Sequence, residues 1–287
     1  MSPKPAMTIT ARTIAEVRER LRDAARPLGL VPTMGALHEG HLELLRHARE
    51  SNATVVMSLF VNPAQFASGE DLAAYPRDEA RDERLAAQAG VDVVFAPTVA
   101  EMYPDGFATA IEVTGLSEPL EGAARGAAHF RGVATVVAKL LNIVGPDVAY
   151  FGQKDAQQAA VVRRLARDLD MAVAIEVRPT VRAPDGLALS SRNAYLDGED
   201  RVRATGLWRA LSAAAALVEA GERERVVVAG AAEAELAREG ITAEYLAIVD
   251  PQTLVEVQLI EGPVMIAVAA RIGGARLIDN VVANPPA

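Results

Sequence analysis

The sequence predicts an α/β fold, in which a Rossmann-like, doubly wound parallel sheet is followed by a smaller α+β domain. Up to about residue 180, short apolar runs alternate with amphipathic helical stretches, the pattern of βαβ units and a parallel sheet. Polar clusters directly follow several apolar runs, at the strand ends where such sheets bind ligands. Beyond residue 180 the pattern changes. We therefore expect domains at residues 1–180 and 181–287.

The elements of the first domain follow from the spacing of apolar residues. Ile14, Val17 and Leu21 form the stripe of an amphipathic helix, and residues 54–61 (TVVMSLFV) are apolar throughout, as in a buried parallel strand. On this basis helices are expected at residues 13–25, from 37 onward, and at 78–89, 129–144 and 156–169; strands are expected at 28–31, 54–61, 91–95, 148–151 and 172–177. Residues 97–106 are expected to form a loop.

The second domain has fewer elements in a different order. Residues 199–220 and 224–238 have helical spacing, and residues 244–249, 264–270 and 276–278 have the character of short strands. Helices grouped before strands are typical of an α+β domain, so the strands are expected to pair mainly antiparallel.

Composition limits the class of protein. Half of the chain (51%) is apolar, enough for a sizeable core, and the absence of cysteine excludes disulfides, thiolate metal sites and cysteine nucleophiles. A net charge of −9 argues against a nucleic-acid partner, which needs a basic surface. No signal peptide and no apolar run of membrane-spanning length are present. These features predict a soluble cytoplasmic protein without a membrane partner.

One motif, residues 32–41 (PTMGALHEGH), organises the first domain. Gly35 permits a tight turn from a strand into a helix, whose free N–H groups and positive dipole end form an anion site. His38 and His41 share one face of that helix, and Gly40 lets a ligand approach closely. This arrangement favours a phosphate chain as the ligand. A histidine pair at this spacing also occurs as a metal half-site or on a solvated helix face.

Further polar clusters lie where predicted strands end or where the two domains join. They are Asn62 with Gln65, Lys154 with Asp155 and Gln158, and Ser190 with Ser191 and Arg192. Lysine and arginine suit phosphate contacts, and the amides suit a hydroxylated or carboxylated co-substrate. Simpler interpretations are a surface lysine at Lys154, a helix cap at Asp155 and an ordinary turn in the serine-containing loop.

Several catalytic motifs are absent from the sequence. It contains no Ser–His–Asp pattern, no Walker A lysine motif, no GxGxxG and no tight acidic cluster, although Asp78, Asp82 and Glu83 are available. Two imidazoles, a lysine and an arginine around a helix start remain. Such a set stabilises negative charge on transferring phosphoryl or nucleotidyl groups.

Five motifs in order resemble those of the pantothenate synthetase (pantoate–β-alanine ligase) family. They are residues 32–41 (PTMGALHEGH), 60–66 (FVNPAQF), 75–77 (YPR), 151–158 (FGQKDAQQ) and 185–193 (DGLALSSRN), and the likeness extends to 276–280 (RLIDN). The histidine motif alone is shared by a wide nucleotidyltransferase and class I synthetase-like superfamily. The five together are highly specific, and the resemblance covers nearly the whole chain.

The resemblance implies a ligase that depends on ATP and Mg²⁺. The carboxylate of pantoate would attack the α-phosphate of ATP, giving pantoyl adenylate and pyrophosphate. The amine of β-alanine would then displace AMP to give pantothenate. The resemblance also implies a homodimer and a second domain that acts as a lid, which protects the mixed anhydride from water.

The same resemblance implies roles for individual residues. The ATP site would comprise Met34, Gly35, Ala36, Leu37, His38, Glu39, Gly40, His41, Gly152, Gln153, Lys154, Asp155, Val181, Leu189, Ser190, Ser191 and Arg192. The expected catalytic residues are His41, His38, Lys154 and Arg192, with His41 as proton donor. The expected residues of the pantoate and β-alanine site are Gln65, Gln158, Asn62 and Arg125. The ATP phosphates would supply most of the Mg²⁺ ligands, with Asp82 as a candidate protein ligand.

Two positions depart from the family pattern. The chain has Arg125-Gly126-Ala127-Ala128-His129-Phe130 where the family usually has Arg-Pro-Gly-His-Phe, so it is one residue longer there. The sequence leaves the place of Arg125 open. Ala156 stands where an aromatic residue is usual.

Two other functions are compatible with the histidine motif. One is a nucleotidyltransferase acting on a phosphorylated small molecule, and the other is a nucleotide-binding sensor without activity. Gln65 and Gln158 argue against the first, because a phosphate co-substrate calls for basic groups. The intact His38, His41, Lys154 and Arg192 argue against the second.

Overall fold

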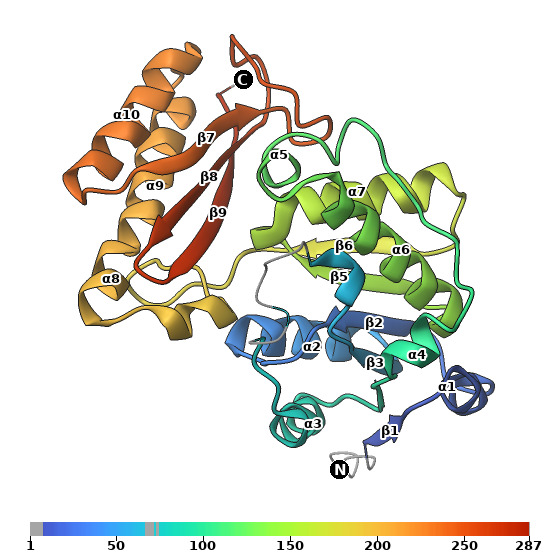
Figure 1. Cartoon of the computed structure of the whole chain (residues 1–287). Helices are drawn as coiled ribbons and strands as arrows, with labels where there is room; N and C mark the ends of the chain where they lie inside the picture. Colours follow the sequence, from blue (N-terminus) through green and yellow to red (C-terminus); the bar gives the residue numbers. More distant parts are fainter. Residues whose placement is uncertain (1–7, 67–71, 73–74, 287) are drawn as a thin grey trace. The chain divides into compact units, whose positions relative to one another are not determined.

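The computed structural model describes residues 8–66, 72 and 75–286 (Figure 1). The chain divides into two compact units. The first unit comprises Met1–Gly152 with Val161–Arg178, and the second comprises Gln153–Ala160 with Pro179–Ala287. The first turn of one helix therefore belongs to the second unit, together with the polar residues Lys154 and Asp155.

The first unit contains a six-stranded parallel sheet in the order β1-β4-β3-β2-β5-β6. Its strands are β1 (Ile9–Ala11), β2 (Leu28–Thr33), β3 (Thr54–Leu59), β4 (Val93–Phe95), β5 (Val148–Gly152) and β6 (Ala174–Arg178). The chain passes outward from β2 through β3 to β4 and then returns to β5, so strand order reverses between β2 and β5. That switch point is where open parallel sheets bind ligands.

Helices connect successive strands of the first unit. They are α1 (Ile14–Leu21), α2 (Glu39–Ser51), α3 (Glu79–Gln88), α4 (Val99–Met102), α5 (Glu121–Arg125), α6 (Ala127–Val144) and α7 (Ala156–Asp168), with a short 3-10 helix η1 (Pro63–Gln65). Consecutive residues Val55, Val56 and Met57 of β3 are all fully buried. Since successive strand residues face opposite sides, both faces of the sheet are covered, as predicted for a parallel sheet.

Some predicted boundaries of the first unit were wrong. The helix predicted to reach residue 25 ends at Leu21, because the chain must turn before Pro27 into β2. The loop predicted at residues 97–106 contains α4, which Thr98 caps by accepting a hydrogen bond from the N–H of Glu101. The short β1 and α5 were not predicted, because three and five residues are too few to show periodicity.

The second unit packs helices against one antiparallel sheet of order β7-β8-β9. The helices are α8 (Gly198–Arg203), α9 (Thr205–Glu219) and α10 (Arg225–Arg238), and the strands are β7 (Ala243–Val249), β8 (Val264–Ile272) and β9 (Ala275–Ala283). Its apolar core includes Leu207 and Leu211 of α9, Val228 of α10 and Ile266 of β8. The predicted antiparallel pairing is confirmed.

Two predictions for the second unit were wrong. The single helix predicted at residues 199–220 is divided at Ala204 into α8 and α9. The last strand was predicted at residues 276–278 but spans Ala275–Ala283. Asp279 and Asn280 interrupt its apolar pattern, although both side chains are buried.

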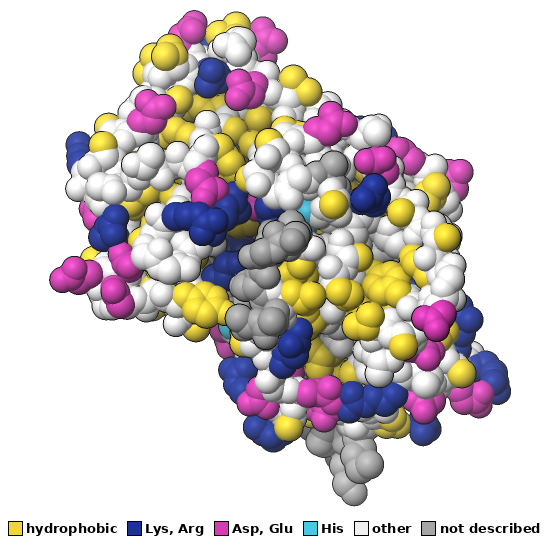
Figure 2. Space-filling view, viewed as in Figure 1, with side chains coloured by type: hydrophobic (Ala, Val, Ile, Leu, Met, Phe, Trp, Pro, Cys, Tyr) yellow, Lys and Arg dark blue, Asp and Glu magenta, His cyan; other side chains and the backbone are white. Residues whose placement is uncertain are grey.

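The surface carries charges of both signs. Acidic and basic side chains are intermixed on the face shown in Figure 2. None of the helices in the described ranges combines the length and the apolar character that crossing a membrane requires.

Candidate active site

The turn between β2 and α2 is held by a carboxylate from α3. Gly35 and Ala36 both have positive φ angles, 85° and 51°. Asp82 is 1% exposed and accepts hydrogen bonds from the N–H of Ala36 (2.8 Å) and of Leu37 (2.9 Å). A Cβ at position 35 would lie 2.9 Å from Oδ2 of Asp82, so only glycine fits. Both Asp82 oxygens thus accept hydrogen bonds from backbone N–H groups and hold the turn before α2.

The two histidines cap the helix that follows this turn. His38 is the N-cap of α2, and its Nδ1 accepts a hydrogen bond from the N–H of Gly40 at 3.1 Å. Nδ1 of His41 lies 3.4 Å from the N–H of His38, closing a reciprocal capping box. An Nδ1 that accepts leaves the proton on Nε2, so both neutral rings present an Nε2–H donor. The ring centroids are 4.1 Å apart, as expected for residues sharing one face.

Asn62 and Gln65 form a second polar group in the first unit. The Nδ2 of Asn62 donates to the carbonyl oxygen of Gly132 (3.1 Å) and to Oε1 of Gln65 (3.2 Å), and its Oδ1 accepts from the N–H of Ala64 (3.2 Å). Backbone partners on both sides fix the orientation of the Asn62 amide. Because Oε1 of Gln65 accepts, its Nε2 is the donor, and it lies 2.9 Å from Sδ of Met34. Gln65 therefore presents an N–H donor beside the histidine motif.

Tyr103 completes the orientation of this amide pair. Its hydroxyl donates to Oδ1 of Asn62 at 2.7 Å, and burial raises the pKa of Tyr103 to about 12. The phenol therefore keeps its proton at neutral pH and continues to donate. No sequence pattern indicated this role, because Tyr103 lies in a segment expected to be a loop.

Replacement of Tyr103 by Phe should change how stability depends on pH. The folded-state pKa is raised from 10.0 to about 12, so the associated stabilisation is fully present below pH 10 and is lost as pH rises through 12. We expect Tyr103→Phe to lose about 1 kcal/mol of unfolding free energy at neutral pH and to decline less steeply above pH 10. Urea unfolding at pH 7 to 11.5 measures both effects; parallel curves for the two proteins would contradict this role.

Helix α6 approaches η1 so closely that a side chain cannot fit between them. A Cβ at Gly132 would lie 2.1 Å from the carbonyl oxygen of Ala64 and 2.7 Å from the backbone nitrogen of Gln65. Nδ1 of His129, also on α6, lies 2.7 Å from the carbonyl oxygen of Gln65. The backbone of Gln65 is thus held from the α6 side by a close contact and a buried hydrogen bond.

Arg125 belongs to the same network despite the extra residue in its loop. Its Nη1 lies 3.0 Å from Nε2 of His129. A guanidinium only donates, so Nε2 accepts and the His129 proton is on Nδ1, where it is donated to Gln65. Gly126, with φ at 88°, separates α5 from α6 and turns Arg125 toward the buried histidine. The structure therefore gives Arg125 a place beside the predicted substrate residues.

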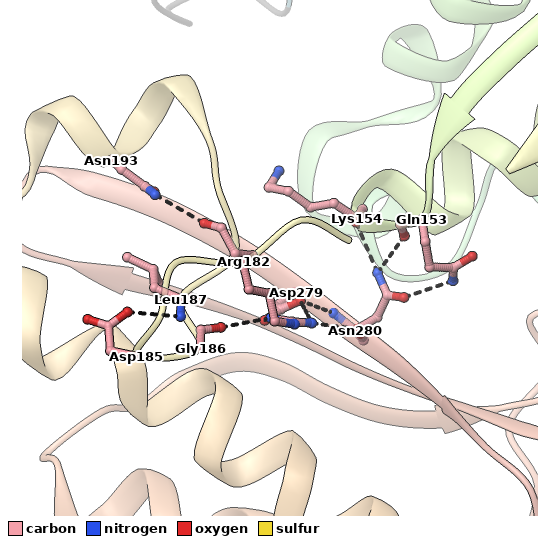
Figure 3. A network of polar contacts seen from close by, with 10 residues as sticks. Gln153, Lys154, Arg182, Asp185, Gly186, Leu187, Asn193, Asp279 and Asn280 are labelled. Atoms are coloured by element: carbon pink, nitrogen blue, oxygen red, sulfur yellow. Dashed lines mark hydrogen bonds and ion pairs between the residues drawn. The ribbon is translucent and has the colours of Figure 1, made fainter. Parts of the chain in front are cut away.

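The remaining predicted residues lie in the second unit, except Gly152, which ends β5. Figure 3 shows two of them, Gln153 and Lys154. Lys154 lies in the 3-10 helix η2 (Gln153–Asp155), with its Nζ 3.8 Å from Oδ1 of Asp155. Ser190 caps the 3-10 helix η3 (Ser191–Tyr195) by accepting from the N–H of Arg192 at 3.3 Å. Gln158, in α7, is half-buried.

The predicted site residues thus form two groups, one in each unit. Met34 to His41, Asn62, Gln65 and Arg125 are in the first; Gln153 to Asp155, Gln158, Val181 and Leu189 to Arg192 are in the second. Across residues 8–66, 72 and 75–286, no three His, Asp or Glu side chains are grouped so as to hold a metal ion.

Comparisons with known proteins agree on one family. A family model described as pantoate-beta-alanine ligase matches residues 9–282. The chain is 56% identical to the pantothenate synthetase of Moorella thermoacetica, an alignment that covers 94% of this chain and 97% of the relative. It is 51% identical to the pantothenate synthetase of Thermotoga neapolitana over 94% of this chain and 98% of the relative.

Solved structures show the same similarity. The pantothenate synthetase of Thermus thermophilus has a TM-score of 0.91 and 49% identity, covering 95% of this chain and 98% of the other. A pantoate-beta-alanine ligase from Francisella tularensis, complexed with beta-gamma ATP and beta-alanine, has a TM-score of 0.78 and 32% identity, with coverages of 96% and 97%.

Proposed function

The chain belongs to the pantoate–β-alanine ligase family, and we propose that its two groups of polar residues divide the reaction between them. The enzyme condenses pantoate with β-alanine, using ATP. The assignment of roles rests on one observation: the start of α2, which His38 and His41 cap, lies beside an amide donor. That donor is Nε2 of Gln65, which contacts Sδ of Met34 in the histidine motif. The capped helix start suits phosphate, and the Gln65 amide suits an oxygen of the acid substrate.

ATP binds along the histidine motif and the polar segments of the second unit. The Nε2–H groups of His38 and His41, with the N-terminal dipole of α2, stabilise charge on the α-phosphate. Lys154 and Arg192 neutralise the departing pyrophosphate. The other residues in this proposal are Gly35, Ala36, Leu37, Glu39, Gly40, Gly152, Gln153, Asp155, Val181, Leu189, Ser190 and Ser191.

Pantoate binds at the amides. The Nε2–H of Gln65 donates to a pantoate oxygen, and Gln158 supplies a second amide contact. A carboxylate oxygen of pantoate attacks the α-phosphorus, the bond to pyrophosphate breaks, and pantoyl adenylate forms. The β-alanine nitrogen then attacks the acyl carbon, loses a proton, and AMP departs with its bonding electron pair. Exclusion of water protects the mixed anhydride between these two steps.

Magnesium is proposed to enter with the nucleotide. The described residues include no cluster of metal-ligating side chains, and Asp82 uses both of its oxygens on backbone N–H groups. This donor set does not suit an ion held by the protein alone, whereas ATP phosphates supply oxygen ligands of the kind Mg²⁺ prefers. The chain's own contribution is to bind the phosphates.

Three further features remain our predictions. They are a domain boundary near residue 180 with residues 181–287 acting as a lid, a homodimer, and a cytoplasmic location. Sedimentation velocity tests the dimer directly, since the expected species has the mass of two chains. A single species with the mass of one chain at micromolar concentration would contradict it.

The reaction sequence is tested by following pyrophosphate release. ATP, Mg²⁺ and pantoate are supplied first, and β-alanine is added later. We expect a small pantoate-dependent burst, close to one equivalent of enzyme, followed by sustained release once β-alanine is present. The absence of pantoate-dependent release would overturn the proposal and favour a nucleotidyltransferase with another substrate.

Replacement of Arg125 by Ala should weaken pantoate binding. Arg125 fixes the tautomer of His129, which in turn holds the carbonyl oxygen of Gln65. Loss of one hydrogen bond from a charged donor should raise the KM for pantoate about tenfold, with a smaller change in the KM for ATP. Steady-state kinetics with pantoate and ATP varied in turn measures the two KM values. Unchanged KM for pantoate would mean that Arg125 does not act on this site.

A further inference from the structure

Strand β9 carries two adjacent buried polar residues that the reaction itself does not use. Asp279 and Asn280 are each 4% exposed, in a strand whose neighbours Leu277 and Ala283 belong to the apolar core. Burying a polar group is costly unless it is hydrogen-bonded, and the large majority of buried polar groups have partners. Their partners are therefore informative, and Figure 3 shows that these partners lie on two different segments of the second unit.

Asn280 holds the backbone of the lysine segment. Its Nδ2 donates to the carbonyl oxygens of Gln153 (2.9 Å) and Lys154 (3.0 Å). Its Oδ1 accepts from Nε2 of Gln153 at 2.9 Å. Since the two backbone oxygens can only accept, the amide has one possible orientation, and all three contacts converge on the 3-10 helix that carries Lys154.

Asp279 holds the other segment through Arg182. The two side chains form a bidentate ion pair, Nη1 to Oδ2 at 2.5 Å and Nη2 to Oδ1 at 2.9 Å. The guanidinium also donates to the carbonyl oxygen of Gly186 (3.1 Å) and lies 3.8 Å from the ring centroid of Trp208. A planar guanidinium fixed on three sides is a rigid anchor for its backbone.

The anchored arginine lies at the base of the loop that leads to Ser190 and Arg192. Arg182 and Ala188 form an antiparallel bridge, and the N–H of Leu189 donates to the carbonyl oxygen of Val181 at 3.0 Å. Both segments of the second unit that the proposed function assigns to ATP are therefore fastened to neighbouring residues of one strand.

We propose that Asn280 is a positioning residue for Lys154, and that Asp279 and Asn280 together make β9 the common base of both nucleotide-binding segments. This inference rests on the proposed role of Lys154 in binding ATP. Asn280 acts through the backbone of residues 153 and 154 and through the side-chain amide of Gln153. Its removal frees that backbone, and a displacement of about 1 Å in a charge-stabilising group is enough to impair catalysis.

Replacement of Asn280 by Ala should therefore lower kcat/KM for ATP about tenfold or more and leave the KM for pantoate nearly unchanged. Asn280→Asp has the same shape but directs a carboxylate oxygen at two carbonyl oxygens, so its loss should be at least as large as that of Ala. Val282→Ala, an exposed position on the same strand, is the matched control and should keep the parent kinetics.

A double-mutant cycle with Lys154→Ala decides between positioning and general damage. If Asn280 acts through Lys154, Asn280→Ala should change kcat by less than about twofold in the Lys154→Ala background. If Asn280→Ala lowers kcat by the same factor in the Lys154→Ala background as in the parent enzyme, the inference is overturned. If Asn280→Ala does not fold, Asn280→Asp, which keeps the shape of the side chain, replaces it in the cycle, and its loss should likewise vanish in the Lys154→Ala background.

The same measurements separate failure of the inference from failure of the proposed function. Impaired Lys154→Ala together with normal Asn280→Ala would contradict the positioning role alone. Nearly normal Lys154→Ala would contradict the proposed role of Lys154, and the inference that depends on it.

Discussion

His41→Ala should lower turnover by about a hundredfold or more, the typical effect of losing one donor aimed at developing charge. The reason lies in the capping box: Nδ1 of His41 faces the N–H of His38, which leaves Nε2–H as the donor toward the α-phosphate. Pantoate-dependent pyrophosphate release under saturating substrates measures the effect. Nearly normal turnover would remove His41 from the catalytic residues.

Two further substitutions of His41, each of which reproduces one of its two ring nitrogens, separate its capping role from its donor role. His41→Asn places an amide oxygen where Nδ1 stands, so it keeps the cap and loses the donor at Nε2. His41→Gln extends an amide nitrogen toward the Nε2 position and restores a donor. We expect Asn to be nearly as inactive as Ala and Gln to recover part of the activity. The reverse order would mean that capping of α2 is the main contribution of His41.

Gly132→Ala should damage both stability and the pantoate site. The added Cβ would lie 2.1 Å from the carbonyl oxygen and 2.4 Å from the carbonyl carbon of Ala64, and backbone atoms cannot turn aside as a flexible side chain can. Helix α6 and η1 must separate, which breaks the hydrogen bond from Asn62 to Gly132 and moves Gln65. We expect a loss of about 3 kcal/mol of unfolding free energy, at the upper end for overpacking.

Kinetics and a matched control test this prediction. The KM for pantoate should rise at least about tenfold, since Gln65 loses its fixed position. Gly230→Ala makes the same chemical change in α10, where the added Cβ would meet no atom within 4 Å apart from nearby backbone of its own helix, and should be neutral or slightly stabilising. Equal effects of the two substitutions on stability and pantoate KM would show that the close approach at Gly132 is unimportant.

Much of the fold was predictable because it depends on local periodicity. The alternation of apolar runs and helices predicted the parallel sheet, and the change of pattern after residue 180 predicted the antiparallel one; both are confirmed. Periodicity did not find α5, the division at Ala204 or the full length of β9. In β9 the cause is specific: Asp279 and Asn280 are polar in sequence and buried in the fold, so the pattern placed the end of the strand too early.

The sequence by itself determined the motifs, their order and the family, because these depend on residue identity and spacing alone. Only the tertiary structure decided which distant side chains hold those motifs in place. Asp82 holds the turn before α2, while His129 and Asn280 hold Gln65 and Lys154 by hydrogen bonds to their backbone oxygens. A hydrogen bond to a backbone group depends on where the chain passes and not on which residue it carries, so no sequence pattern records it.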